Sequence, residues 1–272
     1  MENRGVLNFF EARLFARAKS SKVFALGLIK SLIVASKISM DKEYAEYLLE
    51  ETKKNYNQTA ESYTRTRAFV PEDIKSMAEF TQDGDRVLDS GCASGRLFGV
   101  LKDRNVDYLG VDFSERLISI AQKTYPETKF QVANILNLPV PENYFDKVYS
   151  ISVIHNIPSK DFQLQYLKES KRVLRPGGML ILRVWDFWKR KTFPALFLKY
   201  TFLKIFGKSK LDLKDVFLPW KDSNGKILVS RYFHAFAKKE IENLVKEAGF
   251  SIKKIWRAGE DPRSNIYLIA EK

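Results

Sequence analysis

Short apolar runs alternate with segments of helical periodicity along most of the chain, and most runs end in polar or glycine residues. This alternation predicts strands joined by helices, and therefore an α/β sheet with mostly parallel strands. The runs that we interpret as strands lie at 87–89, 108–112, 129–132, from 146 onward, 179–185 and 265–270. Helices are expected at 41–80 with a break at Pro71, and at 97–105, 114–125, 167–174 and 240–250.

The helical segment before the first strand carries an apolar stripe. Its members are Tyr44, Tyr47, Leu48, Tyr56, Tyr63 and Phe69. Further along the chain, Ser114 is expected to cap a helix that has Glu115 in its first turn. Residues 175–178 contain a proline and two glycines, which predicts a turn before the strand at 179–185.

A glycine-spaced turn after the first strand is the centre of the predicted site. Gly91 and Gly95 let the backbone approach a ligand closely, and the next helix offers unpaired N–H groups at its start. Their G-x-x-x-G spacing differs from the G-x-G-x-x-G of dinucleotide sites. Asp89, just before the turn, would repel a pyrophosphate but attract an ammonium group. A cationic cofactor without a pyrophosphate therefore fits this turn best.

A second acid stands at the end of the next predicted strand. Asp112 follows Gly91 by 21 residues, the position from which a carboxylate can hold the hydroxyls of a ribose. Together the two acids indicate a nucleoside-containing cofactor at the carboxyl edge of the sheet.

Four ordered segments resemble the class I S-adenosylmethionine-dependent methyltransferases, of the methyltransferase type 11 kind: VLDSGCASGR at 87–96, LGVDFS at 109–114, and the stretches 130–157 and 167–182. The resemblance implies a Rossmann-like α/β fold, with a mostly parallel seven-stranded sheet, helices on both faces and an N-terminal helical extension. It implies S-adenosylmethionine as the cofactor. The residues it assigns to that cofactor are Tyr63, Arg67, Asp89, Gly91, Ala93, Gly95, Arg96, Asp112, Phe113, Asn134, Ile135 and Ile151.

Two of these positions depart from the family pattern. Ala93 replaces the commoner middle glycine of the turn, and Asn134 stands where relatives usually have an aspartate that accepts from the adenine amino group. An asparagine carbonyl can accept the same bond without the assistance of a charge.

Charge and composition narrow the class of protein. A net charge of +13 favours acidic partners such as nucleic acid or an anionic membrane surface. The single cysteine excludes an intramolecular disulfide and suits a reducing compartment, so we expect a cytoplasmic protein. Two histidines and one cysteine, far apart in sequence, predict no metal site.

Two basic segments flank the motifs. Residues 1–40 carry seven Lys or Arg against two Glu, with an interrupted apolar stretch that is short for a membrane span. We interpret 1–40 as an amphipathic extension and 41–272 as the methyltransferase domain. A basic, aromatic insertion lies at about 187–215, and its range 189–214 holds eight Lys or Arg and one Asp. Packing on the domain, RNA binding and peripheral membrane contact are open alternatives for both basic segments.

Motifs near the C-terminus resemble the tRNA wobble-uridine carboxymethyl methyltransferases. VFLPW at 216–220, SRYFHAF at 230–236 and the pair Thr66–Arg67 carry this likeness. It implies methylation of the carboxylate of 5-carboxymethyluridine in tRNA, and an activating small protein partner as in eukaryotic members. The residues that we expect at the methyl acceptor, as carboxylate ligand or neighbour, are Arg231, Tyr232, His234, Arg183 and His155.

A second hypothesis keeps the catalytic domain and changes the acceptor. The Asn/Asp-Pro-Pro-Tyr signature of amino-group methyltransferases is missing after the fourth strand, which argues against an exocyclic amine. A small-molecule, lipid or quinone-like acceptor at a membrane surface would use the two basic segments for membrane contact.

Overall fold

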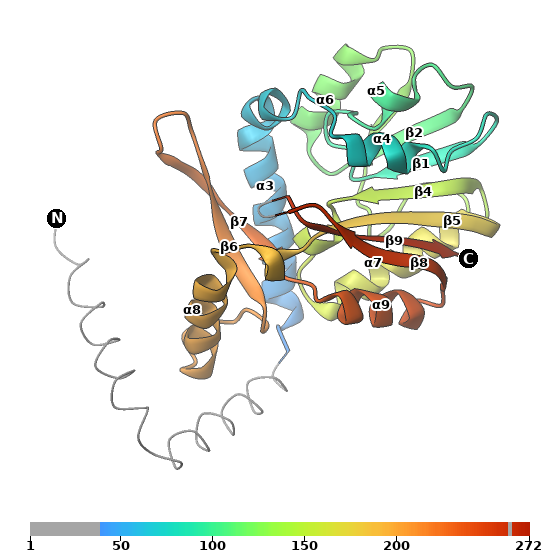
Figure 1. Ribbon diagram of the computed structural model, residues 1–272. Coiled ribbons are helices and arrows are strands. Elements are labelled where there is room, and N and C mark those ends of the chain that lie inside the picture. The colour runs from blue at the N-terminus through green and yellow to red at the C-terminus, as the bar shows by residue number, and fades with distance from the viewer. Residues whose placement is uncertain (1–38, 261–262) are drawn as a thin grey trace.

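The computed structural model describes residues 39–260 and 263–272, so the extension expected at 1–40 falls almost wholly outside it. Its centre is a seven-stranded sheet in the order β3-β2-β1-β4-β5-β9-β8 (Figure 1). The first five strands of that order pair in parallel, whereas β9 is antiparallel to both β5 and β8. The expected mostly parallel, Rossmann-like sheet is therefore confirmed.

The strands of the main sheet are β1 (Arg86–Ser90), β2 (Asp107–Asp112), β3 (Lys129–Val132), β4 (Phe145–Ile151), β5 (Leu174–Trp185), β8 (Ser251–Ala258) and β9 (Asn265–Glu271). A separate two-stranded hairpin consists of β6 (Asp215–Lys221) and β7 (Ile227–His234). Apolar residues that point to alternate faces of these strands bury both faces of the sheet.

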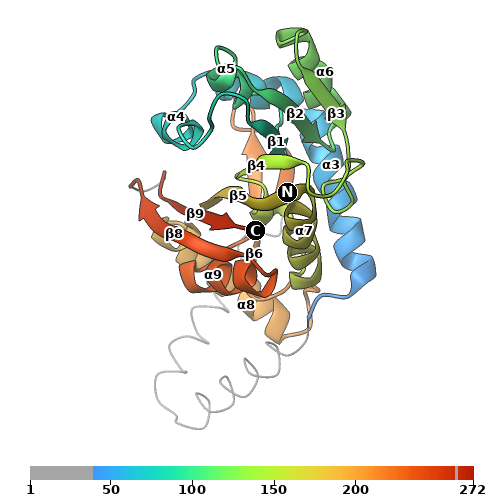
Figure 2. The same cartoon turned by 90° about the vertical axis from the view of Figure 1, so that its right-hand side faces the viewer.

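Helices cover both faces. On one face, α4 (Glu72–Ala78), the single turn α5 (Phe98–Leu101) and α6 (Glu115–Thr124) contribute to one apolar core. On the other face, α7 (Lys160–Val173) and α9 (Lys238–Glu247) lie beside each other over a second core (Figure 2). Ser114 caps α6 as expected, since its hydroxyl accepts a hydrogen bond from Leu117 N at 3.2 Å.

A further unit lies at one end of the sheet. The long helix α3 (Lys42–Thr66) runs between the sheet and the β6–β7 hairpin, and α8 (Phe193–Ile205) packs on the hairpin (Figure 1). Phe193 and Phe233 share one apolar cluster, while Leu48 of α3 and Tyr232 share another. The hairpin is thus attached by packed side chains, because it shares no strand ladder with the main sheet.

Several boundaries differ from the sequence-based expectation. Helix α7 begins at Lys160 instead of Leu167, because Ser159 caps it and accepts from Phe162 N at 3.3 Å. The chain at 174–178 belongs to β5 and not to a separate turn, and a register shift opposite Phe145–Lys147 accommodates it.

Other differences concern helix ends and unassigned strands. Helix α5 ends at Leu101, well short of residue 105, and α9 ends at Glu247, where Gly249 adopts a φ of +88° that stops the helix. The strands β6, β7 and β8 were not expected. Within the apolar stripe of α3 and the segment after it, Tyr47 and Phe69 are exposed rather than packed.

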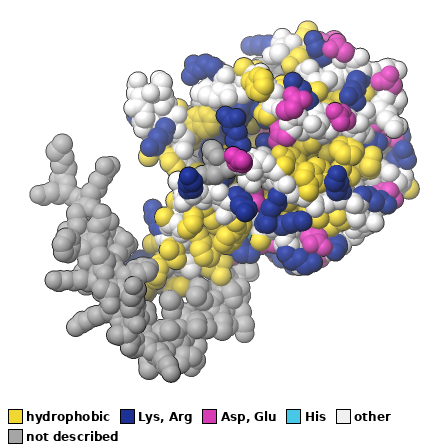
Figure 3. Space-filling view, in the orientation of Figure 1, with side chains coloured by type: hydrophobic (Ala, Val, Ile, Leu, Met, Phe, Trp, Pro, Cys, Tyr) yellow, Lys and Arg dark blue, Asp and Glu magenta, His cyan; other side chains and the backbone are white. Residues whose placement is uncertain are grey.

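The basic insertion at 187–215 contains η2 (Phe187–Lys189) and α8. Apolar side chains gather over α8 in the space-filling view, with Lys and Arg side chains around them (Figure 3). Leu198 and Phe206 are 46% and 66% exposed. Over the described residues, every helix is too short or too polar to cross a bilayer.

Gly110 of β2 gives a test of the packing that supports the site. A Cβ there would lie 2.5 Å from the Phe130 ring and 3.0 Å from Cys92 Sγ, so Gly110→Ala should lower the free energy of unfolding by about 1–3 kcal/mol. Chemical denaturation measures this change. Gly99→Ala is the matched control, because its Cβ would meet chiefly the movable hydroxyl end of Tyr125. Equal stability of the two variants would contradict this account.

Candidate methyltransferase site

A cavity of about 330 Å³ opens at the carboxyl edge of the sheet, beside α3. The turn after β1, the ends of β2 and β3 and the loop after β4 all contribute to its wall, as the parallel order requires. Predicted cofactor residues in its lining are Tyr63, Gly91, Ala93, Asp112, Phe113, Asn134, Ile135 and Ile151.

The glycine turn is held close to its neighbours. Gly91 has a φ of +82°, and a Cβ there would come within 2.4 Å of the Val153 side chain. Ala93 also has a positive φ, of 50°, and its N–H donates to Asp112 Oδ2 at 3.0 Å. Ala93 therefore adopts a left-handed backbone conformation, and its hydrogen bond to Asp112 at the end of β2 supports that conformation.

Asp89 lies beneath the cavity rather than in its lining. Its carboxylate is almost fully buried and accepts a 2.7 Å hydrogen bond from the Tyr108 hydroxyl. Burial raises the pKa of Asp89 to about 7, although the Tyr108 hydrogen bond opposes that change. A positive group beside this carboxylate would restore its charged form.

Asp112 and Asn134 face the cavity from the ends of β2 and β3. Asp112 Oδ1 accepts from Ser114 N at 2.9 Å, and burial raises the pKa of Asp112 to about 6. Asn134 Oδ1 accepts from Leu136 N at 2.9 Å, so its carbonyl already supports the local turn. A carbonyl oxygen can accept a second hydrogen bond, and a ligand can still use it.

Besides the predicted Tyr63, helix α3 supplies a longer wall that the motifs did not indicate. Leu49, Thr52, Lys53 and Tyr56 of this helix line the cavity. Asn57, on the same helix, accepts a 2.7 Å hydrogen bond from the Ser114 hydroxyl and so attaches α3 to the end of β2. The apolar stripe predicted a packed helix, but nothing in its spacing indicated which surface it covers.

An arginine-rich cluster adjoins the cavity on the side of the hairpin. The guanidinium of Arg67 lies 4.0 Å from the ring centroid of Tyr63 and 4.9 Å from that of Trp220. Arg231 lies 4.5 Å from the Trp220 centroid and is 7% exposed. Within residues 39–260 and 263–272, no carboxylate lies within ion-pair distance of Arg67, Arg231 or Arg96.

Burial lowers the pKa of Arg231, and the neighbouring Arg67 lowers it further, while the Tyr56 hydroxyl interacts with the guanidinium and opposes both effects. Tyr56 also lines the cavity and donates to Asn156 Oδ1 at 3.2 Å. The cationic cluster and the cavity thus share a wall. Such an arrangement can hold an anion next to whatever occupies the cavity.

Arg183 and His155 are already engaged within the chain. Arg183 Nε lies 2.7 Å from Asp73 Oδ2, and its Nη1 donates to Ser152 Oγ at 2.9 Å. His155 is buried among the rings of Trp185, Phe187 and Phe233. Burial lowers the pKa of His155 well below its usual range, and its Nδ1 accepts from Trp185 N at 3.3 Å.

Tyr232 and His234 point away from Arg231. Alternate side chains of a strand face opposite sides, and Tyr232 packs with Ala45 and Leu48 of α3. His234 lies between Asp215 and Glu240, at 2.6 Å and 3.2 Å. In the described part of the chain, no cluster of three or more His, Cys, Asp or Glu could hold a metal ion.

Comparisons with known proteins show what the chain and its fold are similar to. Residues 88–182 match the family model described as a methyltransferase domain. The tRNA (carboxymethyluridine(34)-5-O)-methyltransferase of Schizosaccharomyces pombe is 28% identical over 84% of this chain and 98% of its own length. The probable tRNA methyltransferase 9B of Mus musculus is 32% identical over 54% of this chain. The match spans only 32% of that mouse protein.

Among solved structures, an S-adenosylmethionine-dependent methyltransferase from Methanosarcina mazei superimposes with a TM-score of 0.62. That likeness covers 72% of this chain and 96% of the other, at 21% sequence identity, and so concerns the fold. Residues 88–182 therefore match a methyltransferase domain, the chain has the Rossmann-like fold of S-adenosylmethionine-dependent methyltransferases, and its sequence resembles the tRNA carboxymethyluridine methyltransferases.

Proposed function

We propose that this protein transfers a methyl group from S-adenosylmethionine to the carboxylate of 5-carboxymethyluridine at the wobble position of tRNA. The S. pombe relative, which is named for this reaction and matches along almost its whole length, supports the proposal. The observation that carries it is the buried guanidinium of Arg231, beside the cavity and without an acidic partner in residues 39–260 and 263–272. A buried cation of this kind fits an anionic acceptor.

The cavity fits the proposed cofactor. Asp89 would attract the ammonium of its amino-acid part, Asp112 would hold the ribose hydroxyls, and Asn134 would accept from the adenine amino group. Position 91 has to be glycine, because a side chain there would clash with Val153, and the absence of a side chain leaves the backbone of the turn accessible to the cofactor. When bound, S-adenosylmethionine supplies a methyl group activated by a sulfonium.

The acceptor chemistry needs orientation more than proton transfer. A carboxylate is already a nucleophile at neutral pH, so no general base is required. The fork of Arg231 can hold a carboxylate while leaving an oxygen lone pair free for attack. The indole of Trp220 stacks on the Tyr63 ring and contacts the guanidiniums of both Arg67 and Arg231, which keeps the two cations close to each other. Holding the reacting atoms in line accounts for most of the rate.

The alternative acceptor, a small or lipid-like molecule at a membrane surface, is favoured by the exposed Leu198 and Phe206 of the α8 region. The buried, unpaired Arg231 favours an anionic acceptor, which places the tRNA proposal first. A cytoplasmic location and an activating protein partner stay predictions from the sequence.

The product identifies the reaction. With labelled S-adenosylmethionine, tRNA bearing 5-carboxymethyluridine should take up label that mild alkali releases as methanol, because the product is an ester. A matched tRNA bearing the uncharged amide, 5-carbamoylmethyluridine, should take up none. Alkali-stable label in RNA would contradict the carboxylate, and label confined to lipid or small molecules would favour the alternative acceptor.

Arg231→Ala should lower kcat/KM for the tRNA by about 30-fold to 1,000-fold, because a buried charge contact of this kind is worth about 2–4 kcal/mol. The affinity for S-adenosylmethionine, measured by calorimetry, should be unchanged. Arg65→Ala is the control, since Arg65 is exposed near the end of the same α3 helix as Tyr56. Normal turnover in Arg231→Ala would remove this guanidinium from the acceptor site.

Asp89→Ala should abolish cofactor binding, whereas Asp83→Asn, a change at an exposed acid, should not. Because burial raises the pKa of Asp89 to about 7, binding of a cation beside this carboxylate should release a proton near neutral pH. Affinity should therefore weaken as the pH falls from 8 to 6. Calorimetry in buffers of different ionisation enthalpy measures both effects, and pH-independent binding would contradict the role of Asp89.

A further inference from the structure

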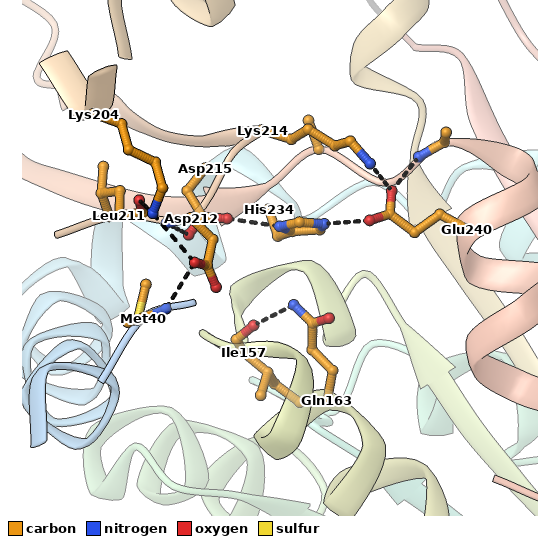
Figure 4. A network of polar contacts seen from close by, with 12 residues as sticks. Met40, Ile157, Gln163, Lys204, Leu211, Asp212, Lys214, Asp215, His234 and Glu240 are labelled. Carbon is orange, nitrogen blue, oxygen red and sulfur yellow. Dashed lines mark hydrogen bonds and ion pairs between the residues drawn. The ribbon is translucent and has the colours of Figure 1, made fainter. Parts of the chain in front are cut away.

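A network of charged side chains, centred on the buried His234 and Asp215, lies at one end of the β6–β7 hairpin (Figure 4). His234, the last residue of β7, lies opposite Asp215 in the hairpin register, and its Nδ1 is 2.6 Å from Asp215 Oδ1. Its Nε2 is 3.2 Å from Glu240 Oε1, in the first turn of α9. Helix α9 packs on the main sheet through Ile241, Leu244 and Val245, so one imidazole joins the hairpin to the catalytic core.

Lysine side chains and backbone N–H groups contact the acidic side chains around this imidazole. Glu240 Oε2 accepts from Lys214 Nζ at 3.0 Å and from Ala237 N at 3.1 Å. Asp215 Oδ2 accepts from Asp212 N at 2.9 Å, and Asp212 in turn lies 3.5 Å from Lys204 Nζ of α8. Among the described residues, His234 is the ion-pair partner of the fully buried Asp215.

The imidazole is charged at neutral pH. Burial lowers the pKa of His234, but hydrogen bonds to Asp215 and Glu240 outweigh that effect and raise the pKa to about 9. Burial alone would raise the pKa of Glu240. The interactions with His234 and Lys214 outweigh burial and lower that pKa to about 2. Because the folded pKa of His234 is raised, its contribution to stability is complete below about pH 6.5 and is lost as the pH rises through about 9.

The geometry points to His234 as a positioning residue that holds β7, and with it Arg231, at a fixed place beside the cavity. This inference rests on the proposed role of Arg231. His234 and Tyr232 share one face of β7, and Arg231 and Phe233 share the other, so His234 acts through the strand. The hairpin shares no ladder with the main sheet, which leaves side-chain contacts such as this one to set its position.

His234→Gln should lower kcat/KM for the tRNA by about 100-fold, since a displacement of about 1 Å at the reacting groups has an effect of that size. Cofactor affinity should stay unchanged. In an Arg231→Ala background the same substitution should have little further effect, because both changes remove one function. Losses that multiply in the double variant would overturn the inference.

Glu240→Gln is a milder variant that keeps a hydrogen-bonding group at this position. It should move the alkaline limb of the kcat/KM profile from about pH 9 toward neutrality, because the imidazole loses one stabilising charge. Glu242, on the same helix, forms ion pairs with Lys239 and Lys246, so Glu242→Gln should leave the profile unchanged. Identical profiles for the two variants would overturn the inference.

Hydrogen–deuterium exchange separates this inference from the proposed reaction. In His234→Gln, backbone amides of β6 and β7 should exchange faster while those of β1 and β4 stay protected. Unchanged exchange in the hairpin overturns the positioning role. If the wild-type protein fails to esterify tRNA, the proposed function fails, and the exchange result still decides whether His234 fixes the hairpin.

Discussion

The carboxylate of Asp112 is the contact on which the cavity depends. One oxygen accepts from the backbone of Ala93 in the turn after β1, and the other accepts from the backbone of Ser114 at the start of α6. The Ser114 hydroxyl then donates to Asn57 of α3. A single buried acid thus joins two strand ends and, through one serine, the long helix that closes the cavity.

A second constraint is electrostatic. Asp89 and Asp112 are buried acids on the side proposed for the cofactor, whereas Arg67 and Arg231, on the side proposed for the acceptor, are cations without acidic partners within the described chain. Neither set neutralises the other, because Tyr56 and Tyr63 stand along the wall that the cavity and the arginines share. This separation suits a cationic methyl donor and an anionic acceptor that must meet at one point.

The hairpin that carries Arg231 is positioned by a different principle. Side-chain packing against α3 and α8 holds the hairpin along its length, and the contacts of the buried His234 with Asp215 and Glu240 hold one end of it. Buried ion pairs of this kind give little net stability but strongly favour one geometry when all partners are present. The β6–β7 hairpin, although it lies outside the main sheet, can therefore hold the guanidinium of Arg231 in a defined place.

Sequence by itself determined six strands of the main sheet, the glycine turn and the two acids, because strand periodicity, glycine spacing and the 21 residues from Gly91 to Asp112 are local properties. The tertiary structure decided which groups face each other. Tyr56 became a wall of the cavity, and His155 and His234, expected at the acceptor, lie buried in an aromatic cluster and an ion network. The packing of the hairpin on α3 joins residues more than a hundred positions apart, and its charged contacts join residues at no regular spacing, so both could be recognised only in three dimensions.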